Sequence, residues 1–140
     1  MFIGKHLKQL IVQKGKTHIE IGQTGERIAV AYLKQKGYKI LKRNVRYSWG
    51  EIDIVAKDYN NVLVFVEVKS LNQLKEVYDQ ENRLRPEDNL TRFKLFKLKK
   101  ACSFFANQNP KLTTKGWRVD LLALTISGKD CDIKHLENVA

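Results

Sequence analysis

Cysteine is scarce in this sequence: only Cys102 and Cys131 are present, and they lie far apart. Two isolated cysteines exclude a disulfide framework, and together with His6, His18 and His135 they match no zinc-ligand spacing. Long apolar segments are also missing. No run approaches the roughly 18 residues that a membrane span needs, and the N-terminus lacks the hydrophobic segment of a secretory signal. We therefore expect a cytoplasmic protein with reduced thiols and no transmembrane segment.

Proline and glycine are sparse, with two and eight copies in 140 residues, which argues against long disorder. Hydrophobic residues make up 43% of the chain, enough for one substantial core. We expect a single domain over residues 20–140, preceded by a basic arm over residues 1–19. Acidic residues are outnumbered, 15 against 26 Lys and Arg, so the formal net charge is +11. Such a charge favours a polyanionic partner but does not distinguish DNA, RNA and an anionic membrane surface.

Two apolar, β-branched segments, 51–56 and 62–69, flank a turn-forming sequence at 58–61 and predict a β-hairpin. With the turn centred on Asn60, Asp53 lies opposite Glu67, because both are equidistant from the centre. Facing carboxylates repel each other, at a cost of about 0.2–1 kcal/mol on a sheet surface and more when buried. Lys69 shares a face with Glu67 and supplies one positive charge, and a divalent cation would supply more.

The apolar positions from about residue 21 to 36 fall on one helical face, and Gly37 is expected to end that helix. On a helical wheel Glu26 lies at the edge of the buried stripe, where a solvated surface role is the simpler alternative to a functional one. Gly22 and Gly25 would let this part of the helix approach another backbone closely.

A second helix is predicted from Pro86 to about Asn107. Lys94 and Lys97 fall within its apolar arc, near the N-terminal end. They either reach past the core toward the hairpin carboxylates or extend to solvent at its edge. The apolar arc itself is formed by Leu90, Phe93, Ala101, Phe104 and Phe105.

The remaining segments complete an α/β fold. Residues 38–46 predict a first strand, antiparallel to the hairpin, and residues 116–126 a buried strand parallel to the one at 62–69. Residues 70–85 are polar and are expected to form a flexible loop or an irregular short helix, which is either a flap over the site or a passive insertion. Asp120 is expected to make a structural hydrogen bond or ion pair, and His135 to pack.

The order helix, three strands, helix, strand, with carboxylates at Glu26, Asp53 and Glu67 and a Glu-x-Lys spacing ending at Lys69, resembles the restriction-endonuclease-like PD-(D/E)xK core. This αβββαβ core has a mixed central sheet flanked by helices. More closely, the sequence resembles the YraN family of predicted bacterial endonucleases, which are similar to archaeal-type Holliday junction resolvases. The motifs are Gly25-Glu26, Gly37-Tyr38, Arg43-Asn44, Gly50-Glu51-Ile52-Asp53, Phe65-Val66-Glu67-Val68-Lys69 and His135-Leu136-Glu137-Asn138.

The resemblance implies a role for each of these residues. Asp53 and Glu67 would be catalytic metal ligands, Lys69 the catalytic lysine, Glu26 a further ligand or a supporting carboxylate, and Lys94 a catalytic lysine on the following helix. The resemblance also implies a possible homodimer, by analogy with the resolvases. Ser70-Leu71 departs from the family, which usually has a basic residue soon after the Glu-x-Lys.

These residue types suit phosphodiester hydrolysis. Carboxylate oxygens without Cys or His favour Mg²⁺ or Mn²⁺ over zinc, and such an ion activates water and neutralises phosphate charge. Phosphates would be bound by the basic strand and the second helix, giving salt-dependent binding with little sequence reading. The predicted nucleic-acid contacts are Lys42, Arg43, Arg46, Arg92 and Lys97.

Three functions follow as hypotheses. The first is a metal-dependent endonuclease acting on DNA, with possible selectivity for branched or junction structures. The second is a non-catalytic nucleic-acid-binding module on a nuclease fold. The third is a basic protein-interaction or membrane-surface domain that uses the arm at residues 1–19.

Overall fold

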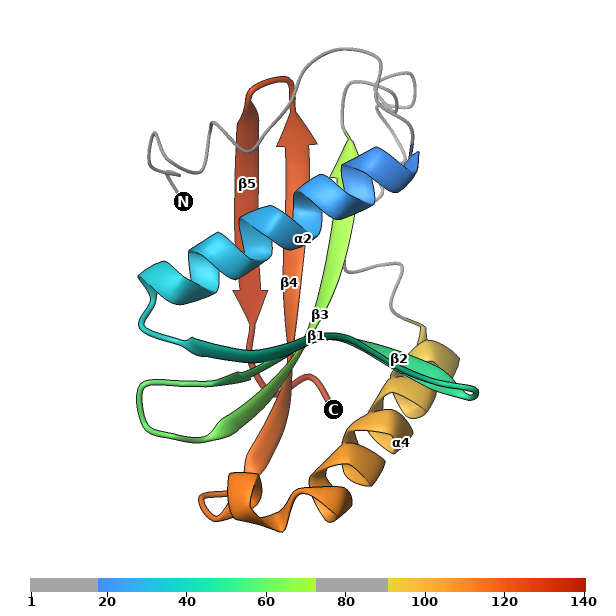
Figure 1. The fold of residues 1–140 in the computed structure, drawn as a ribbon. Coiled ribbons are helices and arrows are strands. Elements are labelled where there is room, and N and C mark those ends of the chain that lie inside the picture. Colours follow the sequence, from blue (N-terminus) through green and yellow to red (C-terminus); the bar gives the residue numbers. More distant parts are fainter. Residues whose placement is uncertain (1–17, 73–90) are drawn as a thin grey trace.

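The computed structural model describes residues 18–72 and 91–140, with side chains at 24–71 and 91–140 (Figure 1). Helix α2 (His18–Gln35) precedes strands β1 (Lys39–Tyr47), β2 (Gly50–Lys57) and β3 (Leu63–Asn72). Helix α4 (Arg92–Gln108) and the short 3₁₀ turn η2 (Pro110–Thr113) follow, and strands β4 (Trp117–Ser127) and β5 (Asp130–Leu136) end the chain. The predicted arm lies outside the described residues apart from 18 and 19, which belong to α2. Within the predicted loop, residues 70–72 belong to β3 and residues 73–85 lie outside the described residues.

The five strands form one mixed sheet in the order β1-β2-β3-β4-β5. β3 and β4 run parallel, as predicted for a strand-helix-strand crossover, and every other neighbouring pair is antiparallel. Figure 1 shows β1 and β2 turned strongly relative to β4 and β5. This α/β fold is consistent with the restriction-endonuclease-like core, with β5 added at the edge beside β4.

Helix α2 ends where the sequence indicates. Gly37 has a φ of +88°, which an L side chain rarely adopts, and the amide of Tyr38 donates to the carbonyl of Leu33 at 2.9 Å. The amide of Gly37 donates to the carbonyl of Lys34 at 3.1 Å, completing the pair of bonds typical of a glycine-terminated helix. The chain therefore turns sharply from α2 into β1.

Helix α4 begins later than predicted. Thr91 has extended backbone angles, and its hydroxyl accepts a hydrogen bond from the amide of Lys94, so Thr91 caps a helix that starts at Arg92 rather than at Pro86. Its buried face also differs from the prediction, because Phe93 and Phe104 are exposed. The buried positions are Leu98, Ala101, Cys102, Phe105 and Ala106.

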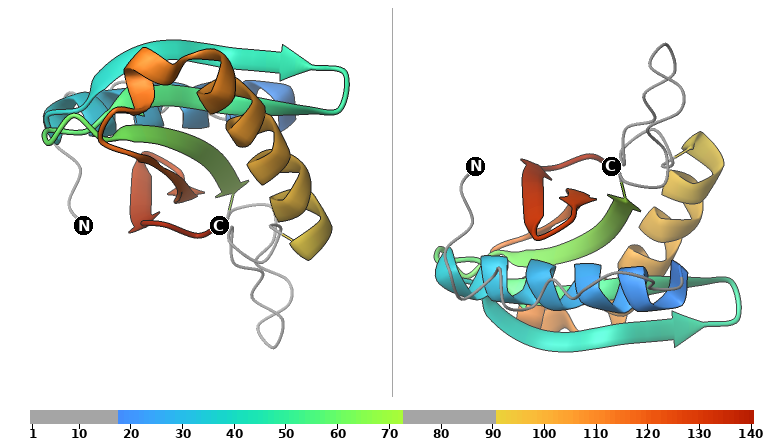
Figure 2. Two further views of the ribbon diagram at one scale, coloured as in Figure 1. Left: turned by 90° about the horizontal axis from the view of Figure 1, so that it is seen from below. Right: turned by 90° about the horizontal axis from the view of Figure 1, so that it is seen from above.

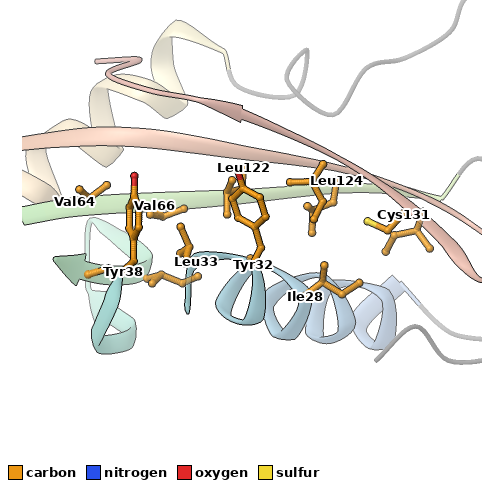
Figure 3. Close-up of a cluster of buried hydrophobic side chains, with 14 residues drawn as sticks. Ile28, Tyr32, Leu33, Tyr38, Val64, Val66, Leu122, Leu124 and Cys131 are labelled. Carbon is orange, nitrogen blue, oxygen red and sulfur yellow. The ribbon is translucent and has the colours of Figure 1, made fainter. Parts of the chain in front are cut away.

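Two core clusters lie on opposite faces of the sheet, which explains why β3 and β4 are apolar on both faces. α2 packs on the first cluster, whose members on β2 and β3 are Ile54, Ala56, Val64 and Val66 (Figure 3). α4 packs on the second, with Val55, Leu63 and Phe65 at the alternate positions. The two helices can be followed along the curved sheet in Figure 2.

Among the described residues, no helix is long and apolar enough to cross a membrane.

Candidate functional site

The β2–β3 ladder opens at the two carboxylates that the hairpin pattern places opposite each other. Its last pair is Ile54 with Val66, a register that places the centre of the turn at residue 60, as predicted. β3 continues past this point to Asn72, but it pairs there only with β4. Asp53 and Glu67 therefore stand one step beyond the last paired residues, where β2 and β3 separate. We call this position the fork.

Alternation of side chains along β2 breaks at Asp53. Ile52 packs in the α4 cluster and Ile54 in the α2 cluster, although residues two apart share a face in a regular strand. On β1 the opposite residue is Asn44, between the pairs Arg43–Ile54 and Val45–Ile52, and its φ is +53°. Both strands are thus locally irregular at the level of Asp53.

Asp53 is a partly buried carboxylate with a specific backbone partner. Its Oδ2 accepts a hydrogen bond from the amide of Val68 at 2.8 Å. Burial and the nearby carboxylate of Glu67 raise the pKa of Asp53 to about 8, and the carboxylate of Glu26 adds to this effect. The Val68 amide and the ammonium of Lys69 act in the opposite direction without cancelling it. The ionised form of Asp53 is therefore disfavoured at the fork unless further positive charge is bound there.

Glu67 and Lys69 form an ion pair on the same strand. The Nζ of Lys69 lies 3.0 Å from Oε1 of Glu67, and only 25% and 14% of these side chains is exposed. Two residues apart on β3, they project from the same face, as the sequence predicts. Lys69 is thus held beside the carboxylates rather than extending freely into solvent.

Glu26 approaches the fork from α2, and a glycine makes that approach possible. A Cβ placed on Gly25 would overlap the hydroxyl of Ser70, so helix and strand are closer here than any larger residue allows. This confirms the predicted close approach at Gly25. The carboxylate of Glu26 lies 3.6 Å from the guanidinium of Arg43 on β1. Arg43, predicted as a phosphate contact, therefore also faces a candidate metal ligand.

The predicted lysines of α4 have different positions. Lys94 lies four residues before Leu98 and seven before Ala101, so it is on the same side of α4 as these buried residues. The side chain of Lys94 itself is exposed. Lys97 points to the outer face, and its Nζ lies 4.5 Å from the centre of the Phe93 ring. Placing Lys97 within the buried arc was therefore wrong, because that arc was drawn around Phe93.

The other predicted nucleic-acid contacts are exposed. Arg92 begins α4, and Lys42 and Arg46 lie on the edge strand β1. The Nζ of Lys42 lies 5.8 Å from the centre of the Phe105 ring. Arg46 forms a solvent-exposed pair with Glu51 at 3.6 Å. These side chains give β1 and α4 a basic outer surface, without contacts that fix a substrate position.

The donor set at the fork suits a hard divalent cation. Carboxylate oxygens are the ligands that Mg²⁺ prefers, and Mg²⁺ typically uses one or two of them together with waters and substrate phosphates. Asp53 and Glu67 could supply such a pair. Among the described residues, the one group of three possible ligands with atoms within 4.8 Å of one another lies elsewhere, at Asp120, His135 and Glu137. Glu26 fits a supporting position better than a direct one in this structure.

That other group is an ion network. Oδ1 of Asp120 accepts from the guanidinium of Arg118 at 3.0 Å and from the amide of Asn138 at 3.0 Å. Its Oδ2 lies 2.9 Å from Nε2 of His135. Arg118 thus supplies positive charge directly to Asp120. The predicted ion pair of Asp120 is confirmed, and His135, which was predicted to pack, contacts the rings of Tyr32 and Tyr38 and also bonds to Asp120.

Comparison with known proteins identifies the family. The model of the uncharacterised protein family UPF0102 matches residues 25–124. The chain belongs to the UPF0102 family. A UPF0102 protein of Thermodesulfovibrio yellowstonii is 38% identical over 86% of this chain and 95% of its own length. UPF0102 proteins of Fervidobacterium nodosum and of a Sulfurihydrogenibium species are 34% and 40% identical, over 96% and 84% of this chain and 92% and 90% of their own lengths.

UPF0102 is the YraN family, so the family prediction is confirmed. The stretch that matches the UPF0102 model contains the five residues predicted as metal ligands or catalytic groups. The names of these relatives give no activity.

Proposed function

We propose that this UPF0102 protein is a metal-dependent endonuclease that hydrolyses phosphodiester bonds in DNA. Asp53 and Glu67 would hold Mg²⁺ or Mn²⁺, with Glu26 as a further or supporting carboxylate. The observation that carries the proposal is the fork, where two facing carboxylates and a paired lysine stand where β2 and β3 separate. Burial beside Glu67 disfavours the ionised form of Asp53, and a divalent cation bound there would stabilise both carboxylates in their charged form.

The residues at and around the fork would have separate roles in hydrolysis. A bound divalent cation would lower the pKa of a water molecule and neutralise charge on the scissile phosphate. Lys69, kept within 3.0 Å of Glu67, would orient that water or stabilise charge on the phosphate. Lys94 would assist from the exposed end of the buried stripe of α4. Phosphates would be bound by Lys42, Arg46, Arg92 and Lys97. Arg43 would contact both a substrate phosphate and Glu26.

The test is cleavage of single-stranded, duplex and four-way-junction DNA in Mg²⁺ or Mn²⁺. We expect cleavage to require the metal and to be lost in Asp53→Asn and Glu67→Gln, which keep the shape of each side chain. Lys69→Ala should also be inactive, because it removes the cation that the structure pairs with Glu67. Preferential cleavage of the junction would support selectivity for branched DNA.

Matched variants keep this test specific. Glu51 lies two residues before Asp53 on β2, and its carboxylate forms an exposed pair with Arg46, so Glu51→Gln is a control close to the fork. Lys57→Ala removes a lysine from the same strand away from the fork. Both should cut like the unaltered protein. Cleavage that persists in Asp53→Asn and Glu67→Gln would come from a contaminating nuclease and would refute the assignment.

One observation favours a second function, a non-catalytic nucleic-acid-binding module. Glu26 already faces Arg43, and the three predicted carboxylates do not form a compact group of metal ligands. This alternative predicts salt-sensitive DNA binding that EDTA and Asp53→Asn leave unchanged, without cleavage in any metal. A cytoplasmic location and a homodimer complete the proposal, and size measurement in solution tests the dimer.

A further inference from the structure

Exposed aromatic side chains gather around one surface. Within the described part of the chain, five large hydrophobic side chains are exposed, and four of them belong to α4 or to the adjoining β1–β2 turn. Phe93 and Phe96 on α4 are 66% and 69% exposed. Exposure of such rings costs free energy in water, so a cluster of them indicates a contact surface. The four are Trp49, Phe93, Phe96 and Phe104.

The three phenylalanines lie on the outer face of α4. At 100° per residue, positions 93, 96, 97, 100 and 104 fall within about 100° of one another, opposite the buried face. The stripe extends over about 16 Å, because 11 residues separate its ends at 1.5 Å each. Phe93 and Phe96 stand at one end of this stripe and Phe104 at the other.

The far end of the stripe is a rigid aromatic group. The ring of Trp49 stacks on that of Tyr47 at 5.1 Å between centroids, with planes 5° apart. Phe104 meets both rings edge-on, at 5.1 Å and 5.0 Å. A Cβ on Gly50 would lie 3.4 Å from the backbone carbonyl of Lys97, so the β1–β2 turn rests closely on α4. Trp49 is therefore held in place before any ligand arrives.

Cations lie between these rings. Lys97 and Lys100 occupy the same stripe, and the Nζ of Lys97 is 4.5 Å from the centre of the Phe93 ring. Residues 91–108 contain five basic side chains and no acidic one. A membrane-surface helix separates its apolar face from its basic face, whereas here Lys97 and Lys100 lie on the same face as the exposed phenylalanines, between Phe96 and Phe104. A face that offers both rings and cations suits a nucleic-acid strand, because bases can stack on the rings while phosphates pair with the lysines.

We propose that this aromatic stripe, formed by Trp49, Phe93, Phe96, Phe104, Lys97 and Lys100, is a platform on which unpaired bases of a nucleic-acid strand stack. A paired base inside a duplex already stacks on its neighbours and offers no free face, so the platform selects strands with unpaired nucleotides. The inference rests on the proposed function and names the feature of the substrate that would be recognised: a single-stranded segment next to the bond that is cut.

Binding is measured in EDTA, where a metal-dependent nuclease does not cut. The chain has two tryptophans, and Trp117 contacts Phe65 in the α4 cluster. Trp117→Phe therefore leaves Trp49 as the only tryptophan and makes its fluorescence a report on the platform. A single-stranded thymidine oligonucleotide of about 15 nucleotides should quench this fluorescence, because stacked bases quench an indole, and a duplex of equal length should quench it much less.

Two substitutions test the platform directly. Phe93→Ala combined with Phe96→Ala should weaken binding of the single strand by roughly tenfold or more, from the usual effect of removing a stacked ring. Duplex binding, which depends on the retained lysines, should change by less than about twofold. Both side chains are exposed, so the fold should tolerate their loss. Tyr59→Ala is the matched control, since Tyr59 is the fifth exposed aromatic residue and lies in the β2–β3 turn.

The identity of the ligand is tested by removing the bases. An abasic oligonucleotide keeps its phosphates, and its affinity for the unaltered protein should fall to that of the double phenylalanine variant. Equal binding of the abasic and normal strands, or an unchanged affinity of the double variant, would overturn the platform. Quenching of Trp49 by anionic lipid vesicles but not by the oligonucleotide would overturn it in favour of a membrane contact. The platform would also be overturned if the protein self-associates at high concentration and the double phenylalanine variant does not. The stripe would then be an interface with a second copy of the chain.

Failure of this inference can be separated from failure of the proposed function. Asp53→Asn should abolish cleavage and keep the quenching of Trp49, because the fork and the stripe share no residue. A protein that cuts DNA but shows no preference for unpaired strands would refute the platform alone. A protein that binds unpaired strands but never cuts would retain the platform and refute the nuclease.

Discussion

Replacing Arg118 by leucine should destabilise the fold strongly at neutral pH. Its guanidinium donates to Asp58 at 2.7 Å, to Asp120 at 3.0 Å and to the hydroxyl of Tyr38 at 2.9 Å. Both carboxylates are buried, with 4% and 0% of their side chains exposed. Arg118 thus connects β4 to the β2–β3 turn and to the end of α2. Leucine would fill much of the space but leave two carboxylates without their main cation.

The magnitude follows from burial. Removing one partner of a buried ion pair typically costs about 3–5 kcal/mol. Asp58 would still accept from the amides of Asn60 and Val62, and Asp120 would still have His135 and Asn138. Because these bonds remain, we expect the free energy of unfolding to fall by about 3 kcal/mol, at the lower end of this range. For a domain of this size, such a loss lowers Tm by about 10 °C.

The loss should depend on pH in a defined direction. Burial by itself raises the pKa of Asp58 and of Asp120, but hydrogen bonds, including those from Arg118, hold both pKa values below their usual range. Their stabilising effect is therefore complete above the unfolded pKa of about 4 and is lost as the pH falls through the lower folded values. Without Arg118 both carboxylates protonate more readily. The stability difference between the two proteins should be largest near pH 7 and narrow toward pH 4.

Urea unfolding at pH 7.5 and pH 4.5 measures both effects. Arg46→Leu is the matched control, because Arg46 forms an exposed pair with Glu51 and should contribute between 0 and about 1 kcal/mol. His135 and Glu137 also face this network, so His135→Gln and Glu137→Gln backgrounds show whether the narrowing belongs to the aspartates. A loss below about 1 kcal/mol at pH 7.5, or a difference that grows toward acid, would refute the assigned role of Arg118.

Three further predictions concern the fork and its supports. In EDTA, Asp53→Asn should raise the stability of the fold by about 1 kcal/mol in thermal unfolding, because it removes a partly buried carboxylate that faces Glu67; a lower Tm would contradict the repulsion. Gly25→Ala should lower Tm by several degrees by pushing α2 away from Ser70, and the additional change Ser70→Gly should restore most of the loss; no rescue would contradict the close approach. Adding Mn²⁺ at 100 times its Kd should raise the stability of the unaltered protein by about 2.7 kcal/mol and that of Glu67→Gln by clearly less, and an equal gain in both would exclude Glu67 as a ligand.

Local patterns were sufficient for much of the fold. The apolar, β-branched composition of 51–56 and 62–69 predicted both strands, and a turn centred on Asn60 predicted their register, because the hairpin is a short-range structure. Gly37 fixed the end of α2 for a similarly local reason. The parallel β4 followed from the handedness and length of a crossover connection rather than from its own residues.

Other features depend on contacts between distant segments. The partner of Asp58 is Arg118, 60 residues away, and the turn sequence alone indicates only that Asp58 accepts from nearby amides. Hydrophobicity alone places Phe93 in the core and therefore assigns the wrong outer face to α4. In the structure Phe93 and Phe96 are exposed, although phenylalanine is usually buried, and this exposure depends on which side of α4 packs on the sheet.

The fork shows how a sheet can build a charged site without an unsatisfied backbone. Where β2 leaves β3, the amide of Val68 loses the neighbouring strand as a partner, and the carboxylate of Asp53 accepts its hydrogen bond instead. The irregularity that separates Ile52 and Ile54 onto opposite clusters lies at Asp53 itself. One residue thus replaces the missing ladder bond and places a carboxyl group close enough to Glu67 and Lys69 for their charges to shift its pKa. A substitution that keeps the acceptor, such as Asp53→Asn, should preserve the fork, whereas Asp53→Ala should lose both the hydrogen bond and the site.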